Sequence, residues 1–423
     1  SPFNAEGGVK MWGHYTSKDM IDWEYQGVKL YPDQPFDCHG VYSGSAFIED
    51  DKIYVYYTGN VKLEDGDFDY INTGRESNTV LVVSEDGKTF GSKKELMRNV
   101  DYPSDLTCHV RDPKVWKDGD TYYMIQGART KEDVGQALIF ASKDKINWKF
   151  RSRVESEKPF GYMWECPDLF EMDGQLYIIC CPQGVETQGI DYENVHQVTA
   201  MKLDYDFDTD EYEITDIKLF DRGFDFYAPQ TFEDESGRRI LIGWMGIPDA
   251  DYTNPTEEAG WQHALTIPRE LSVRDGKLIQ EPIEELKQLR SEDKAVCTFC
   301  YGQTIIMQNA IYEAVVDFKR CREMVMTLRE GITLSYKDNI LTLNLGVYGS
   351  GRSTRKVRLE KLEHLQIFAD TSSLEIFVNH GEEVFTTRIY NHYGRLLING
   401  ECSGIMTVYP LKSFEIEGGR HEE

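Results

Sequence analysis

"EMDGQLYIICCPQ" (residues 171–183) joins an acidic Asp-Gly turn to a run of apolar and aromatic residues. A turn signal followed by such a short run is typical of a strand in a β-hairpin. The same order recurs in "EDDKIYVYYTGN" (49–60), "WKDGDTYYMIQGA" (116–128) and "EDESGRRILIGWMG" (233–246). Copies separated by several tens of residues indicate a repeated structural unit.

A second pattern, Ser-x-Asp-x-x-x-aromatic, alternates with the first. It occurs in "SKDMIDW" (17–23), "SEDGKTF" (84–90) and "SKDKINW" (142–148). The interval is too long for one turn of a solenoid but fits a four-stranded propeller blade. Because a single blade cannot bury both faces of its sheet, stacked copies must form the core. We therefore predict an all-β fold, with a five-bladed β-propeller over residues 1–280.

The pattern changes in "LIQEPIEELKQLRSED" (278–293). Ile283, Leu286 and Leu289 have helical spacing and charged neighbours, which predicts a short helix or linker over 281–293. Beyond it, "ITLSYKDNILTLNLG" (332–346) and similar stretches alternate apolar and polar residues between closely spaced turns. This alternation predicts a C-terminal β-sandwich over 294–423.

Charge and hydropathy limit the partners of the chain. The formal net charge of the 423 residues is -27, which argues against nucleic acid or an anionic membrane surface as a main partner. No apolar run approaches the length of a membrane span. The sequence shows no signal peptide, but it opens at Ser1 without an initiator Met, so this absence establishes little. The oligomeric state is left open.

Cysteine usage favours a reducing compartment. The nine cysteines are an odd number without tight pairing, so we expect free thiols and a cytoplasmic protein. Cys297-x-x-Cys300 has no second ligand pair at a zinc spacing. Residues 65–76 have acids at EF-hand offsets, but Tyr70 replaces the turn glycine. We predict no metal site and no organic cofactor.

Two isolated acids occur in apolar and aromatic surroundings. Glu165 lies between Trp164 and Cys166 in "GYMWECPDLF" (161–170), and Asp112 lies in "HVRDPKVW" (109–116). Each acid comes just before a repeat strand, in successive blades. A propeller gathers such equivalent positions around one central funnel. The spacing therefore predicts that both acids face the axis.

The pair suits hydrolysis of a glycosidic bond, which needs a protonated acid at the leaving oxygen and a carboxylate at the anomeric carbon. An apolar setting would raise the pKa of Glu165 and keep it protonated, whereas Arg111 beside Asp112 would keep Asp112 ionised. A purely structural interpretation of the two acids is equally open. In that interpretation, Glu165 is a strand-end acid paired with a nearby base, and Asp112 forms an ion pair with Arg111.

These residues also resemble a known family. "RDP" (111–113) and "ECP" (165–167) look like two of the three signature boxes of glycoside hydrolase family 32, the family of invertases, sucrose-6-phosphate hydrolases and fructanases. Further stretches that are similar to this family are "WGHYTSKDMIDWE" (12–24), "YSGSA" (42–46), "FYAPQTF" (226–232), "GWQHALTIPREL" (260–271) and "LEIFVNHGEEVFTTRIY" (374–390). The resemblance covers essentially the whole chain. It implies a five-bladed propeller with a sandwich, and a retaining hydrolase of terminal β-D-fructofuranosyl groups.

The resemblance also implies a role for each matching residue. Glu165 would be the acid/base, with Cys166 against it, and Asp112 would stabilise the transition state and bind fructose hydroxyls together with Arg111. Tyr227 would lie near the leaving group. The positions expected to line the fructose pocket are Trp12, Tyr42, Ser43 and Trp261. For the two tryptophans, a place in the hydrophobic core is the alternative.

The third family box, Trp-x-Asn-Asp-Pro-Asn-Gly, carries the nucleophilic aspartate and does not occur in the sequence. We expect the nucleophile upstream of residue 1, and hence a first blade that is incomplete at its N-terminal side. If no such segment exists, a non-catalytic sugar-binding or interaction propeller is the alternative function. Sucrose, sucrose 6-phosphate and fructans are all open as substrates. A phosphorylated substrate would need a local cluster of Lys, Arg or His, because the overall charge opposes it.

Overall fold

The computed structural model describes residues 4, 5, 7–302 and 309–418. In these residues the chain is built almost entirely of β-strands, which confirms the predicted all-β class. The helical segments described are short 3-10 turns: η1 (Asn99–Asp101), η2 (Pro255–Ala259), η3 (Glu284–Leu289) and η4 (Gly346–Tyr348). No helix in this part of the chain is long and apolar enough to cross a membrane.

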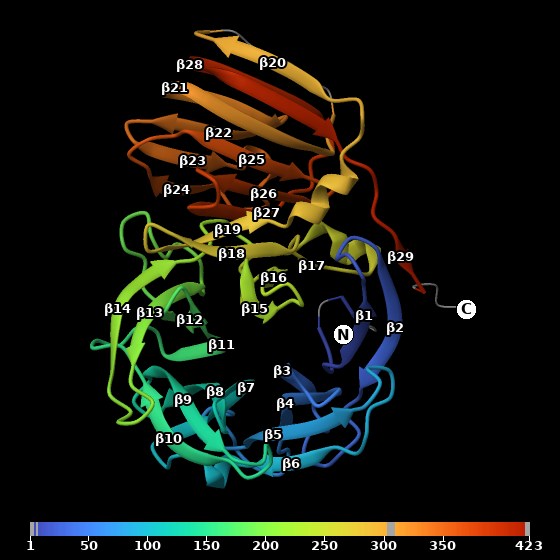
Figure 1. Ribbon diagram of the computed structural model, residues 1–423, viewed down its shortest axis with the longest axis vertical. Helices are drawn as coiled ribbons and strands as arrows, with labels where there is room; N and C mark the ends of the chain where they lie inside the picture. The colour runs from blue at the N-terminus through green and yellow to red at the C-terminus, as the bar shows by residue number, and fades with distance from the viewer. Residues whose placement is uncertain (1–3, 6, 303–308, 419–423) are drawn as a thin grey trace.

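Five sheets surround a central axis as the blades of a propeller (Figure 1). The first contains β1 (Trp12–Thr16), β2 (Trp23–Leu30) and β29 (Ile416–Glu417). The second contains β3 (Val41–Glu49), β4 (Lys52–Lys62), β5 (Arg75–Ser84) and β6 (Lys94–Met97). The third contains β7 (Leu106–Asp118), β8 (Thr121–Thr130), β9 (Gly135–Ser142) and β10 (Lys149–Val154). The fourth contains β11 (Met163–Met172), β12 (Gln175–Gln183), β13 (Thr199–Tyr205) and β14 (Tyr212–Leu219). The fifth contains β15 (Tyr227–Glu233), β16 (Arg239–Met245), β17 (Ala264–Leu265), β18 (Arg269–Arg274) and β19 (Lys277–Pro282). The predicted five-bladed propeller is confirmed.

The two sequence patterns have distinct structural roles in the blades. The acidic turn with its apolar run forms the second strand of a blade, as β4, β8, β12 and β16. The Ser-x-Asp pattern forms the turns between β1 and β2, β5 and β6, and β9 and β10. In each turn the serine hydroxyl accepts a backbone N–H three residues later, for example Lys145 N to Ser142 Oγ at 3.0 Å. Such side-chain bonds fix the reversal of the chain between two antiparallel strands.

The first sheet draws its third strand from the far end of the chain. β29 lies parallel to β2, with Trp23 opposite Ile416 (Figure 1). The backbone N–H of Trp23 donates to the carbonyl oxygen of Glu415 at 2.9 Å. The C-terminal segment therefore covers an edge of this blade that would otherwise expose unpaired backbone groups.

The C-terminal unit is one nine-stranded sheet that folds over itself and packs above the propeller (Figure 1). Its strands are β20 (Ala295–Cys300), β21 (Tyr312–Arg329), β22 (Ile332–Lys337), β23 (Ile340–Asn344), β24 (Thr354–Arg358), β25 (His364–Ala369), β26 (Ser373–Val378), β27 (Glu383–Arg388) and β28 (Gly394–Pro410). β21 pairs with β25 through its first half and with β22 through its second half, and the register shifts between these halves. The resulting layers enclose a large apolar core, as expected for the predicted β-sandwich.

A buried polar network joins the two units. Arg269 of β18 is fully buried, and it pairs with Glu375 of β26 at 2.6 Å and with Asp221 at 3.3 Å. The stretch predicted as a short helix or linker contains η3, whose Leu286 is buried. The domain limits 1–280, 281–293 and 294–423 stay a prediction.

Candidate active site

In four of the five blades, the inner strand carries a β-bulge at an equivalent position. The strand register shifts between Val41 and Gly44 in β3, Arg111 and Lys114 in β7, Glu165 and Asp168 in β11, and Tyr227 and Gln230 in β15. In the last three strands, one bulge residue has a left-handed backbone, with φ of 65° at Asp112, 48° at Cys166 and 45° at Ala228. A proline follows each of these residues. A bulge re-aims side chains, which brings this set of residues to one cavity.

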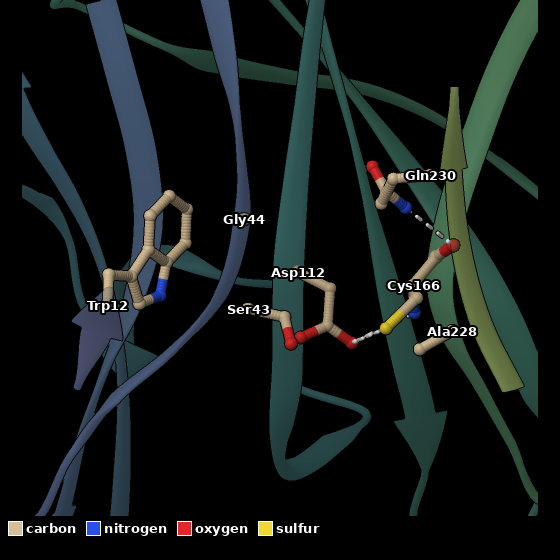
Figure 2. A pocket seen from close by; sticks show the side chains of 7 residues that line it. All are labelled: Trp12, Ser43, Gly44, Asp112, Cys166, Ala228 and Gln230. Carbon is tan, nitrogen blue, oxygen red and sulfur yellow. Dashed lines mark hydrogen bonds between the residues drawn. The ribbon is translucent and has the colours of Figure 1, made fainter. Parts of the chain in front are cut away.

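The cavity has a volume of about 190 Å³ and lies where these bulges meet. Its lining consists of Trp12, Ser43, Gly44, Asp112, Cys166, Ala228 and Gln230. Figure 2 shows Trp12 on one side, Asp112 in the middle, and Cys166 and Gln230 on the other side. Residues from five separate strands, β1, β3, β7, β11 and β15, therefore form a single site.

Asp112 is buried and held from two blades. Its backbone N–H donates to Thr58 Oγ1 at 2.9 Å, and its Oδ2 accepts the backbone N–H of Cys166 at 2.9 Å. Burial and the nearby Glu165 raise the pKa of Asp112 to about 6, although Arg111 acts in the opposite direction. This differs from the expectation that Arg111 would dominate. The reason is geometric, because Arg111 Nε lies 4.0 Å from Asp112 Oδ2 but 3.0 Å from Glu165 Oε1.

Glu165 has polar rather than apolar surroundings. Arg111 donates to its Oε1 from Nε at 3.0 Å and from Nη2 at 2.5 Å, while its Oε2 accepts Tyr227 Oη at 2.6 Å and Gln183 Nε2 at 2.9 Å. The flanking Trp164 instead lies in a separate apolar cluster with no solvent exposure. Neighbouring residues of a strand point to opposite faces, so the apolar neighbours in the sequence do not surround the carboxyl group. The expectation of an apolar pocket for Glu165 was wrong.

Close packing of blades fixes the strand that carries Glu165. A Cβ atom at Gly127 of β8 would lie 1.7 Å from the carbonyl oxygen of Trp164. Only glycine lets β8 approach β11 so closely beside the acid. Burial raises the pKa of Tyr227 well above its usual value, so its hydroxyl keeps the proton that it donates to Glu165.

A polar network links the residues that end the bulges of β7, β11 and β15. Lys114 Nζ donates to Asp168 Oδ2 at 3.2 Å and to Thr231 O at 2.5 Å. Asp168 Oδ2 also accepts the backbone N–H of Thr231 at 2.6 Å, and Gln230 Nε2 donates to Cys166 O at 3.3 Å. This axial network, defined here as Lys114, Asp168, Gln230 and Thr231, ties three blades together. These contacts hold the three bulges in place relative to one another.

The remaining predicted residues fall into two groups. Trp12 and Ser43 line the cavity, and Trp12 Nε1 donates to Tyr42 O at 3.0 Å. Cys166 also lines it, but its thiol and N–H contact Asp112 rather than the expected acid/base (Figure 2). Trp261 is not among the lining residues. It is 45% exposed, and the Arg388 guanidinium lies 5.5 Å from its ring centre.

The sequence reasoning missed Thr58 and Gln183, which hydrogen-bond to Asp112 and Glu165. It also missed the network of Lys114, Asp168 and Gln230. Gln183 ends one copy of the first repeat and Thr58 lies near the end of another, so an alignment of the repeats could have suggested them. Lys114, Asp168 and Gln230 each follow a bulge proline, and this shared spacing was the other available signal.

Comparisons with known proteins show what the chain is similar to. The model described as "Glycosyl hydrolases family 32 N-terminal domain" matches residues 1–282, and the one described as "Glycosyl hydrolases family 32 C terminal" matches residues 301–408. The chain is 38% identical to sucrose-6-phosphate hydrolase of Bacillus subtilis (strain 168) over 416 residues, covering 95% of this chain and 85% of that protein. It is 35% identical to sucrose-6-phosphate hydrolase of Staphylococcus xylosus, covering 99% of this chain and 86% of that protein.

Solved structures of similar proteins also match this chain. The sucrose-6-phosphate hydrolase of Lactobacillus gasseri matches with a TM-score of 0.86 at 26% identity, covering 96% of this chain and 85% of the other. The Bombyx mori GH32 beta-fructofuranosidase BmSUC1 matches with a TM-score of 0.84 at 29% identity, covering 99% of this chain and 88% of the other. A mutant of the Bombyx mori enzyme has been solved in complex with sucrose.

Proposed function

The chain belongs to glycoside hydrolase family 32, and we propose that it hydrolyses the β-fructofuranosidic bond of a small sucrose-type sugar at the cavity beside Asp112. One observation carries the proposal. Two carboxyl groups from successive blades, Asp112 and Glu165, meet at the same guanidinium, that of Arg111, beside a cavity lined by polar and aromatic groups. Cleavage of a glycosidic bond uses a carboxyl group that protonates the leaving oxygen, and a nearby carboxylate can stabilise the positive charge that develops on the sugar.

In the proposed reaction Glu165 acts first as a general acid and gives its proton to the oxygen of the leaving sugar. Tyr227 and Gln183 hold Oε2, and Arg111 holds Oε1, so the carboxyl group has a fixed orientation. After the leaving sugar departs, the same carboxylate takes a proton from the attacking water.

Asp112 has a separate proposed role. Positive charge develops on the fructosyl ring in the transition state, and the carboxylate of Asp112 stabilises it through the sugar hydroxyls. The N–H of Cys166 donates to Oδ2 of Asp112 at 2.9 Å. Trp12 lies on the other side of Asp112 from Cys166 in Figure 2, and Trp12 and Ser43 both line the cavity. Such prearranged charge is a large term in enzymatic rate enhancement.

A retaining reaction also needs a nucleophilic carboxylate about 5–5.5 Å from the acid. Among the described residues that line the cavity, Asp112 is the only one with a carboxyl group, so we assign no residue to this role.

Purified protein from the complete reading frame tests the function as a whole. We expect release of fructose from sucrose, and the β-anomer of fructofuranose as the first product in a time-resolved NMR experiment. Tight binding of the sugar without release of fructose would support the alternative of a non-catalytic sugar-binding propeller. That alternative is not favoured, because the similar proteins that match 95% and 99% of this chain are hydrolases by name.

The free thiols support a cytoplasmic location for this activity. All nine cysteines are free, and several are fully buried, such as Cys180 and Cys181. Free thiols persist in reducing compartments, so we propose that the enzyme works in the cytoplasm.

A further inference from the structure

His196 is a buried histidine that adjoins the groups holding Glu165. It lies between β12 and β13 and is only 4% exposed. The centre of its imidazole ring lies 6.3 Å from that of Tyr227 and 6.4 Å from that of Tyr162. Tyr227 donates a hydrogen bond to Oε2 of Glu165 at 2.6 Å. One residue therefore separates the imidazole from the proposed proton donor.

The backbone of His196 meets the second group that binds the same oxygen. Gln183, at the end of β12, donates to Oε2 of Glu165 at 2.9 Å. Its backbone forms an antiparallel bridge with that of His196. The carbonyl oxygen of Gln183 also accepts the backbone N–H of Tyr162 at 2.8 Å. His196 thus adjoins both side chains, Tyr227 and Gln183, that donate to Oε2 of the acid.

A hydrogen bond joins His196 to the fifth blade. Nε2 of His196 lies 3.0 Å from Oδ2 of Asp249, and it donates there because a carboxylate oxygen accepts. Asp249 lies in the loop between β16 and β17, and its side chain is 73% exposed. β16 pairs with β15, the strand that carries Tyr227. The contact therefore ties the blade that supplies Gln183 to the blade that supplies Tyr227.

Stability alone does not explain an imidazole at this position. Nδ1 of His196 is buried and has no hydrogen-bond partner among the described residues. A buried polar atom without a partner is costly, so an apolar ring would fill the same space at a lower cost. The contact with Asp249 offsets little of this cost, because ion pairs with exposed groups contribute little to stability. What the imidazole adds is a directed N–H between two blades.

We propose that His196 and Asp249 form a positioning pair, which holds Tyr227 and Gln183 against Oε2 of Glu165 and so aims the acid at the leaving oxygen. The inference rests on the proposed function, because it assigns the pair to the proton-donating step. In this role neither residue of the pair touches the sugar. A small displacement of the acid is enough to slow the reaction, since a shift of about 1 Å can cost roughly 10²-fold in rate.

The test compares kcat/KM for sucrose with kcat/KM for an aryl β-D-fructofuranoside that has an activated leaving group, in protein from the complete reading frame. Asp112 is held by Thr58 and Cys166 rather than by the pair, so its stabilisation of charge should persist. Loss of the pair should impair sucrose, which needs a proton at its leaving oxygen, and spare the aryl substrate. We expect His196→Phe to lower kcat/KM for sucrose, relative to the aryl fructoside, by about 10-fold or more.

Further variants separate positioning from packing. His196→Phe keeps an aromatic ring beside Tyr227 and Tyr162 but removes the donor. His196→Gln supplies an amide N–H in place of the Nε2–H group and should restore part of the activity on sucrose. Asp249→Ala removes the acceptor and should reproduce the effect of His196→Phe. The double variant should lose no more than either single variant, since both substitutions remove the same contact.

A second pair of this kind provides the matched control. Nδ1 of His364 lies 2.8 Å from Oδ1 of Asp317. His364 is also buried, and the side chain of Asp317 is 69% exposed. These residues belong to β25 and β21 of the C-terminal sheet, which contribute no residue to the cavity lining. His364→Phe should therefore leave the relative activity on the two substrates unchanged.

The outcomes separate the two proposals. No hydrolysis of either substrate by the wild type would refute the proposed function itself. With an active wild type, an equal loss on both substrates in His196→Phe and Asp249→Ala, or no loss in either, would overturn the positioning pair alone. The same selective loss in His364→Phe would also overturn it. If His196→Phe does not fold, Asp249→Ala decides the question, because it alters an exposed side chain.

Discussion

Asp112 is a buried acid, and burial of its charge lowers the stability of the folded protein at neutral pH. Burial raises the pKa of Asp112 from 3.8 to about 6. Because the folded-state pKa is the higher one, Asp112 has no such effect on stability below about pH 4, where it is protonated in both states. As the pH rises through about 6, the buried carboxylate ionises and destabilises the folded state, by roughly 3 kcal/mol when fully ionised.

We therefore predict that Asp112→Asn is more stable than the wild type at pH 7.5, by up to about 3 kcal/mol, while its activity is lost. The difference in the free energy of unfolding should shrink as the pH falls from 7 to 4. Urea denaturation at several pH values measures it. A difference that does not change with pH would show that the buried charge is not its cause.

The raised pKa of Asp112 also predicts that kcat/KM falls at acid pH. Protonated Asp112 cannot stabilise positive charge on the sugar, so kcat/KM should fall about tenfold per pH unit below about 6. A pH profile of kcat/KM with an uncharged substrate such as sucrose measures this fall directly. A constant value of kcat/KM from pH 7 down to pH 4.5 would contradict the need for an ionised Asp112.

At the scale of elements, the bulges of β7, β11 and β15 depend on the axial network. Lys114→Met would leave Asp168 buried without its cation, and breaking a buried ion pair in this way costs about 3–5 kcal/mol. We predict that Lys114→Met lowers both stability and kcat, since the bulges position Asp112 and Glu165. Lys114→Met combined with Asp168→Leu should recover part of the stability, because no unpaired charge remains. Calorimetry checks both, and a double variant less stable than the single one would contradict this explanation.

The elements also show what the sequence could predict and what it could not. The repeats located β4, β8, β12 and β16, because an acidic turn and an apolar run are local signals. The residues that surround Glu165 are distant from it in the sequence, so no local pattern indicated them. Tyr227 lies 62 positions further along the chain, and the bulge at Cys166 changes the register that the side-chain alternation assumes. The pairing of β29 with β2 joins opposite ends of the chain, and no repeat marks it.

At the scale of the whole molecule, the C-terminal sheet is locked to the propeller by buried charges. Arg269 bridges Asp221 of the propeller and Glu375 of the sheet without solvent exposure of its side chain. We predict that Arg269→Met destabilises the protein by about 3–5 kcal/mol, because two buried acids lose their partner. We also expect the wild type to unfold in one cooperative transition, although its two units are separated in sequence near residues 281–293. Differential scanning calorimetry tests both points, and two resolved transitions in the wild type would contradict the tight coupling.

The most direct test of the proposed catalytic roles compares Glu165→Gln and Asp112→Asn on two substrates, sucrose and an aryl β-D-fructofuranoside with an activated leaving group. We predict that Glu165→Gln lowers turnover of sucrose by roughly 10²–10⁴-fold but affects the aryl fructoside much less, since a good leaving group needs little protonation. Asp112→Asn should impair both substrates, because charge develops on the fructosyl ring whatever the leaving group. Protein from the complete reading frame is used, and circular dichroism confirms that both variants fold. Near-normal turnover of sucrose by Glu165→Gln, or equal rescue of both variants by the aryl substrate, would contradict the assignment of Glu165 as the proton donor and Asp112 as the stabilising carboxylate.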